Sequence, residues 1–148
     1  MNTPLSVPRP VIHHAPALRV VEAAIAKAEA LDIQVCVAVV DSSGRLAAFA
    51  RMPGAFLIAN DLAIKKAGSV AAVGIPAEIV DQALTGEAPR VREGVLGLPH
   101  FTLIRGGLPL RDGNALIGAV GVSGGSEAQD IICAEAGVAA LNNREISA

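Results

Sequence analysis

Apolar and polar positions along the chain change from helical to extended periodicity several times. Leu18, Val21, Ile25 and Ala28 recur at helical spacing, with charged residues off that face. The β-branched run over residues 34–41 is typical of a buried strand. The whole pattern predicts, in order, a helix from Pro16 to about Leu31, strands over 34–41 and 45–51, helices over 55–73 and 77–84, a loop over 87–100, strands over 101–104, 108–111 and 115–122, and a helix from Ser126 to about Leu141.

Turn and cap residues support these boundaries. Gly74 is placed to end the second helix in the left-handed conformation, and Pro76 can open the third. Asp112 and Gly113 form a strong hairpin-turn signal, while Ser126 has the spacing of a capping box with a glutamine three residues on. Strands joined by hairpins pair antiparallel. Because helices precede and follow these strands, we predict an α/β (α+β) fold with a helix-covered sheet.

The length of 148 residues is that of one domain. We predict an extended, proline-rich arm over residues 1–14 and a single domain over residues 15–148. Hydrophobic residues make up 52% of the chain, and the mean hydropathy is +0.51. Since a monomer of this size has little room to hide so much apolar surface, we expect a homo-oligomer, a dimer or larger.

Charge and hydropathy argue against several classes of partner. The formal net charge is −2 and no basic run occurs, so we expect no nucleic-acid partner. No stretch approaches the roughly 18 apolar residues of a membrane span, and the first ten residues do not resemble a secretory signal. We therefore expect a cytoplasmic protein. Cys36 and Cys133 form no Cys/His cluster, so we interpret them as buried hydrophobes and expect no metal site.

Several short motifs occur in an order known from one protein family. They occupy residues 37–46, 51–55, 63–71, 106–109 and 117–124, and Gln129 and Asp130 follow them at the start of the last helix. The ordered set covers residues 17–141. By these motifs the chain resembles the HbpS/GlcG family, whose domain is also found as the C-terminal domain of PduO corrinoid proteins.

The resemblance implies a profilin-like three-layer sandwich, in which helices flank a five-stranded antiparallel sheet. It also implies homo-oligomers, and haem binding in some members. Pro53 stands where the family usually has Asp or Asn, and Ser69 stands where it usually has Thr. Residues 87–100 have no counterpart in the motifs. These departures lie near the expected pocket, so the ligand of this chain can differ from that of its relatives.

Three charged residues in the motifs are candidates for a site. Asp41 ends a buried strand, where it could move a proton or accept hydrogen bonds in an Asx turn. Arg51 could clamp a ligand carboxylate or stay on the surface as an ion-pair residue. Lys66 could neutralise an acidic ligand or form a buried ion pair, with Asp41 or Asp130 as partner. The residue types leave both alternatives open in each case.

His100 is the candidate haem ligand or proton carrier, because it lies in the divergent segment beside a glycine turn. His13 and His14 precede the first helix and are interpreted as part of an exposed arm. The glycine-rich turn over 121–126 could present amides to an anion or serve tight packing and capping. The predicted ligand-binding set is completed by Ser69, Gly106, Gly107, Ser123 and Gly124.

Three functions are compatible with these residues. The first is a small-molecule-binding protein for haem or another carboxylate-bearing ligand, held by Arg51 and Lys66 with His100 as axial ligand. The second is a cofactor-independent lyase or isomerase acting on a small carboxylic or aromatic acid, with Asp41 and His100 as proton carriers. The third is an accessory protein whose motifs serve only fold and assembly.

Overall fold

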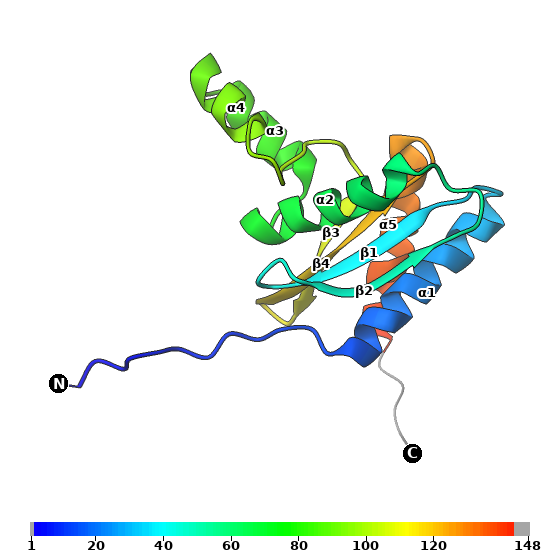
Figure 1. Cartoon of the computed structure of the whole chain (residues 1–148). Helices are drawn as coiled ribbons and strands as arrows, with labels where there is room; N and C mark the ends of the chain where they lie inside the picture. Colours follow the sequence, from blue (N-terminus) through cyan, green and yellow to red (C-terminus); the bar gives the residue numbers. More distant parts are fainter. Residues whose placement is uncertain (1, 144–148) are drawn as a thin grey trace.

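The computed structural model describes residues 2–143 as five helices and four strands (Figure 1). Residue 1 and residues 144–148, the ends of the predicted arm and domain, lie outside the described residues. In chain order the elements are α1 (His14–Ala30), β1 (Cys36–Asp41), β2 (Leu46–Arg51), α2 (Ile58–Val73), α3 (Ala77–Thr85), α4 (Pro89–Leu96), β3 (Gly107–Asp112), β4 (Ala115–Ser123) and α5 (Glu127–Asn142).

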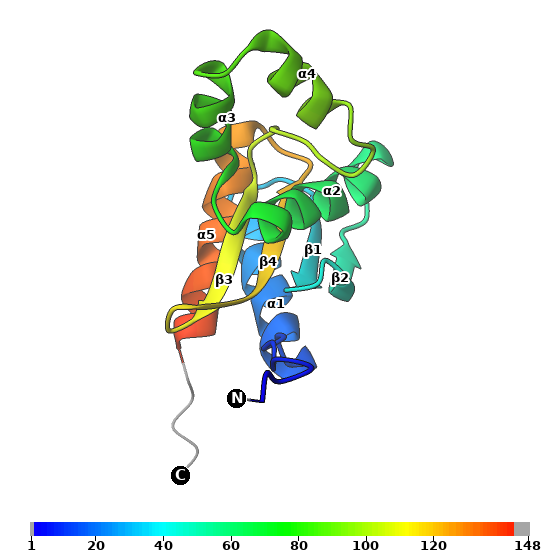
Figure 2. The ribbon, with the colours of Figure 1, turned by 90° about the vertical axis from the view of Figure 1, so that its left-hand side faces the viewer.

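The four strands form one antiparallel sheet in the order β2-β1-β4-β3. Helices α1 and α5 pack together on one face, and α2 crosses the other (Figures 1 and 2). The short helices α3 and α4 extend beyond the sheet on the side of α2 (Figure 2). No helix among residues 2–143 is long and apolar enough to cross a bilayer.

Strand β1 is buried on both faces, which explains its uninterrupted apolar sequence. Val37 and Val39 point into the core beneath α1 and α5, while Cys36, Ala38 and Val40 point into the core beneath α2. All five are fully buried. Successive side chains of a strand face opposite sides. Two layers of helices therefore require apolar residues at every position of the central strand.

The sheet prediction was wrong in its number of strands. The expected strand at 101–104 is absent, and the described residues form four strands rather than five. The amide of Thr102 donates to the Ser69 hydroxyl at 2.9 Å, and the amide of Ile104 donates to the Thr102 hydroxyl at 3.1 Å. Phe101 and Leu103 pack onto α3. Because side chains accept these backbone hydrogen bonds, the segment does not pair with a strand.

The loop predicted over 87–100 contains helix α4. Pro89 stands in the first turn of this helix, where its fixed φ and missing donor suit a helix start. None of its residues is buried. The helix was missed because it is only eight residues long and largely polar, and its proline and glycine are typical of loops. The four predicted helices, both hairpins and the Ser126 capping box are confirmed.

Part of the N-terminal arm is fixed to the domain. The Ile12 amide donates to the Ile117 carbonyl at 2.9 Å, and the Ile12 side chain is buried in the core of α1 and α5. The Ser42 hydroxyl donates to the Pro10 carbonyl at 2.6 Å, and the Arg9 guanidinium donates to the Ser42 carbonyl. Residues 9–12 therefore lie against the body of the protein, whereas the preceding residues project from it (Figure 1).

Candidate functional site

A hollow of about 680 Å³ lies between the β1–β2 turn and the C-terminal half of α2. We call it the His100 hollow. The turn contributes residues 42–45, α2 contributes Gly68, Ala71 and Ala72, and the chain after α4 contributes residues 98–101. Arg9 of the arm completes the lining. The volume of the hollow lies in the range of small-molecule sites.

The His100 hollow combines an apolar wall with positive charge. Gly68, Ala71 and Ala72 follow one face of α2, since helical residues three and four apart are neighbours. Leu98 and Phe101 extend the apolar surface, and His100, Arg9 and Arg45 supply the polar groups; all of these residues line the hollow. Arg45 makes no ion pair within residues 2–143, and His100 is exposed. Both side chains can therefore meet a ligand.

Asp41 holds the turn that forms one wall of the hollow. Its Oδ1 accepts hydrogen bonds from the Ser43 amide at 2.8 Å, the Ser43 hydroxyl at 2.6 Å and the Arg45 amide at 3.2 Å. Burial acts to raise the pKa of Asp41, but these hydrogen bonds outweigh it and lower the pKa below its ordinary value. The carboxylate is thus an Asx-turn acceptor, and nothing in the described residues favours the proton-carrier role predicted for the enzyme alternative.

Lys66 is a buried ion-pair residue and does not line the His100 hollow. Its Nζ lies 3.0 Å from Oδ2 of Asp130 and donates to the Val122 carbonyl at 2.8 Å. Burial is the largest influence on Asp130 and raises its pKa, although Lys66 and the amides of Gly124 and Gly125 act in the opposite direction. Of the two roles predicted for Lys66, the structure therefore shows the buried ion pair, and its partner is Asp130.

Among the other predicted ligand-binding residues, the three glycines allow close packing around this pair, and the two serines are buried. Gly106, with φ of 127°, and Gly107 let β3 approach Lys66, because an added Cβ would lie 2.9 Å from Lys66 Nζ or 2.8 Å from its carbonyl oxygen. Gly124, with φ of 138°, leaves no room for a Cβ beside the Gln34 carbonyl. Ser69 donates to the Lys65 carbonyl and accepts from Thr102, and Ser123 is buried at the end of β4.

The structure separates Arg51 from His100. Arg51 is exposed at the end of β2 and does not line the His100 hollow. Arg9 and Arg45, which were not among the predicted site residues, do line the His100 hollow. Arg45 could have been predicted as a site residue, because it lies in the motif over residues 37–46, close to the candidate Asp41. Arg9 could not have been predicted, because it belongs to an arm without apolar periodicity.

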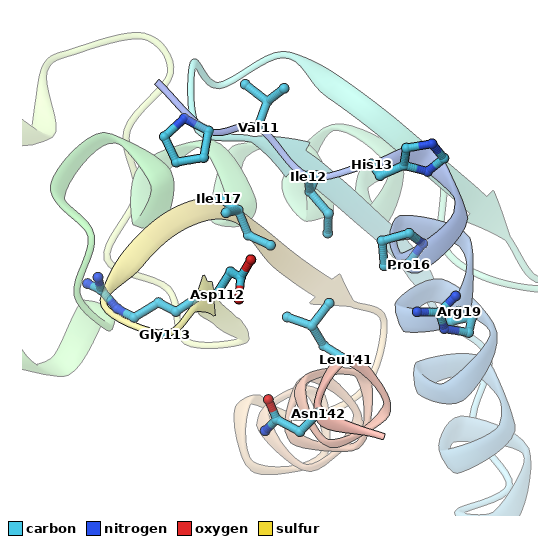
Figure 3. Close-up of a pocket in the computed structure, with 12 residues that line it drawn as sticks. Val11, Ile12, His13, Pro16, Arg19, Asp112, Gly113, Ile117, Leu141 and Asn142 are labelled. Carbon is cyan, nitrogen blue, oxygen red and sulfur yellow. The ribbon is translucent and has the colours of Figure 1, made fainter. Parts of the chain in front are cut away.

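A second hollow, of about 370 Å³, opens between the start of α1, the β3–β4 turn and the end of α5 (Figure 3). Ile12, Ile117 and Leu141 form its apolar floor, and Arg19 stands at its edge (Figure 3). His13, also in its lining, accepts the Ala15 amide at Nδ1 and so caps α1. The hollow is smaller than the His100 hollow, and its histidine already has this structural contact.

Neither cysteine offers a reactive thiol. Cys36 and Cys133 are both free and buried, and burial raises the pKa of Cys133 to about 11. Burial also raises the pKa of Cys36. Among residues 2–143, no three His, Cys, Asp or Glu side chains are grouped so that they could hold a metal ion.

Comparisons with known sequences agree with the motifs. The model of the family described as haem degrading protein HbpS-like matches residues 12–139. The corrinoid adenosyltransferase PduO of Salmonella typhimurium is 37% identical over 121 residues, which cover 81% of this chain and 36% of that enzyme. The chain thus spans about a third of the length of the curated PduO proteins that it matches.

Solved structures share the fold over nearly the whole chain. Klebsiella pneumoniae protein ORFY has a TM-score of 0.88 and 27% identity, covering 98% of this chain and 100% of that one. A PduOC:heme complex has a TM-score of 0.80 and 32% identity, covering 89% of this chain and 96% of that one. The sequence and structural matches together show that the chain belongs to the haem degrading protein HbpS-like family.

Proposed function

We propose that this chain is a small-molecule-binding protein and that the His100 hollow takes an acid-bearing ligand, with haem as the first candidate. The observation that carries the proposal is the meeting of His100, Arg9 and Arg45 around one apolar wall. These three residues come from the segment after α4, the arm and the β1–β2 turn. Each chemical part of a haem has a counterpart among these groups.

The apolar wall suits a flat macrocycle. The Cβ atoms of Ala71 and Ala72 and the bare backbone of Gly68 leave α2 without bulky side chains at the hollow, and Phe101 offers an aromatic ring. Burying apolar ring surface against such a wall contributes about 25 cal/mol per Å². The absence of larger aliphatic side chains on this part of α2 leaves the space that a planar ligand needs.

The polar groups suit carboxylates and iron. Arg45 has its guanidinium available, and Arg9 uses one donor on the Ser42 carbonyl and has others to spare. Guanidinium groups bind carboxylates such as haem propionates through charge-assisted hydrogen bonds. The His100 imidazole is a haem-iron ligand by its chemistry. A protein similar to this chain, PduOC, has been solved as a complex with heme, and this supports the choice of haem as the first ligand to test.

Titration with haemin followed by absorption spectroscopy tests this proposal. The chain has neither Trp nor Tyr, so its own absorption near 280 nm is weak. We expect a saturable Soret band in the wild type, and a lost or shifted band in His100→Ala. Arg45→Gln should raise the Kd about three- to tenfold, as expected for a partly exposed charge pair. His14→Ala and Arg51→Gln are matched controls from outside the hollow, and both should bind as the wild type does.

Two results would contradict the proposal. A titration without saturation would exclude haem as the ligand. Wild-type binding by His100→Ala together with loss of binding in His14→Ala would place the ligand away from the His100 hollow. If haem fails, thermal-shift measurements with small aromatic and aliphatic carboxylates test the broader acid-bearing class, again with Arg45→Gln against Arg51→Gln.

A further inference from the structure

Gly68 lies inside α2, at a position where packing does not require a glycine. Its backbone is helical and its φ is not positive. A Cβ added at Gly68 would meet no heavy atom within 4 Å beyond its chain neighbours and the nearby backbone of its own helix. At Gly137 in α5, by contrast, an added Cβ would lie 2.9 Å from Val20 Cγ1. The fold therefore has room for a side chain at residue 68.

Glycine at residue 68 makes α2 less stable than alanine would. A glycine in a helix interior loses more conformational freedom on folding than any other residue, and it adds no side chain to the packing. Neither a positive φ nor a close contact offsets this loss at Gly68. The packing of residues 2–143 thus gives glycine no advantage over alanine here.

A side chain at residue 68 would point into the His100 hollow. Ala67 faces the sheet, and successive residues of an α-helix point about 100° apart, so residue 68 faces away from the sheet. Gly68 shares a face of α2 with Ala72, four residues later, and both residues line the hollow together with Ala71. An added Cβ would therefore occupy space that the hollow offers to a ligand.

We propose that Gly68 is the residue that makes the His100 hollow selective for a rigid, flat ring. This inference rests on the proposed function and names the contact that recognises the ring. A flat ring can touch the bare backbone at Gly68 and the methyl groups of Ala71 and Ala72 at the same time. A methyl group at residue 68 would lift the ring, because a rigid ring cannot bend around it. A gap of about 0.5–1 Å already removes about a quarter to a half of the dispersion attraction.

Titrations with haemin and with iron-free protoporphyrin IX test the role of Gly68. Absorption follows the binding of haemin, and fluorescence follows the binding of protoporphyrin IX. Gly68→Ala should raise both dissociation constants about five- to tenfold, and Gly68→Leu should raise them at least about fiftyfold, because the added groups overpack the site. The iron-free ring reports the contact with α2 without the proposed bond between iron and His100. His100→Ala should accordingly weaken the binding of haemin alone.

Gly94→Ala is the matched control. Gly94 also lies in a helix where an added Cβ meets open space, and it does not line the hollow. Without ligand, Gly68→Ala and Gly94→Ala should each melt about 1–4 °C above the wild type. Gly94→Ala should leave both dissociation constants unchanged. A gain in stability combined with weaker binding distinguishes a specificity residue from a structural glycine, whose replacement would lower the melting temperature.

The outcomes separate this inference from the proposed function. A wild type that binds neither ligand overturns both. If the wild type binds haemin as proposed, a failure to bind protoporphyrin IX overturns the inference alone, because the ring face then contributes too little. Wild-type affinity of Gly68→Ala for both ligands, a lower melting temperature for Gly68→Ala, or equally weakened binding in Gly94→Ala also overturns it.

Discussion

Lys66 and Asp130 connect α2 to α5, with Nζ 3.0 Å from Oδ2 and both side chains almost completely removed from water. Lys66 also donates to the Val122 carbonyl, so the same ammonium is tied to β4. A buried charge is tolerated only when it has a partner, because desolvation of an unpaired ion costs several kcal/mol. The pair therefore acts as one unit that joins both helical layers to the sheet.

Removal of either partner should strongly destabilise the fold. Lys66→Met or Asp130→Asn should each lower the free energy of unfolding by about 3–5 kcal/mol, because one buried group loses its partner. The double variant Lys66→Met/Asp130→Asn should lose less stability than the sum of the losses in the two single variants. Urea unfolding measures both. Lys65→Met, one position earlier on α2, is the control and should change stability by no more than about 0.5 kcal/mol; additive losses would show that the pair is not coupled.

Gly121 sets the distance between α2 and the sheet. A Cβ at this position would lie 2.2 Å from the Ala63 carbonyl oxygen and 2.6 Å from the Ala67 amide nitrogen. Gly121→Ala should therefore push α2 off β4 and cost at least about 2 kcal/mol in thermal or urea unfolding. Gly94→Ala in α4, where a Cβ meets open space, should instead raise stability by about 0.5–1 kcal/mol. Equal effects of the two substitutions would refute this account of the packing.

The Ser69 hydroxyl accepts a hydrogen bond from residues 101–104, the segment that was predicted to be a strand. In Ser69→Ala the amide of Thr102 loses its acceptor in a buried position, which should cost about 1–3 kcal/mol of stability. Hydrogen exchange should then show faster opening at residues 101–104 than in the wild type. Ser69→Thr retains a hydroxyl and is the conservative control. Unchanged exchange in Ser69→Ala would mean that the segment is held by Phe101 and Leu103 alone.

The attachment of α3 and α4 should depend on pH through Asp81. This carboxylate accepts from Arg92 at 2.5 Å and from Arg105 at 2.9 Å, and these hydrogen bonds lower its pKa below the ordinary value of 3.8. Since the folded state then binds fewer protons than the unfolded state, the stabilisation is complete above pH 3.8 and is lost as pH falls through the lower, folded pKa.

Hydrogen exchange across residues 77–105, corrected for intrinsic rates, measures this dependence. At pH 6, Asp81→Asn should open α3 and α4 more readily than the wild type, and the difference should shrink progressively as the pH falls below 3.8. Glu78→Gln, an exposed carboxylate on the same helix without an ion pair among residues 2–143, should behave as the wild type throughout. A difference that stays constant as the pH falls would mean that the carboxylate charge is not the cause.

Local sequence determined most of the secondary structure and, through the ordered motifs, the family. The apolar run of β1, the Asp112 turn and the Ser126 capping box act between residues close in the chain, so propensity and periodicity reveal them directly. The same local logic failed for α4, a short and largely polar helix whose proline and glycine are typical of loops, and for residues 101–104, where side chains accept backbone hydrogen bonds. Local propensity alone does not distinguish such segments from the alternatives.

Only the tertiary structure decided which candidate residues meet. Asp41 and Lys66 received hydrogen-bonded structural roles, and Arg51 lies outside the hollow that contains His100. Arg9, Arg45 and His100 come from three separate segments, and the folding of the arm and of residues 98–101 against the turn after β1 brings them together. The sequence by itself determined which groups were available. Their grouping required long-range packing, because no local pattern encodes the distance between residues so far apart in the chain.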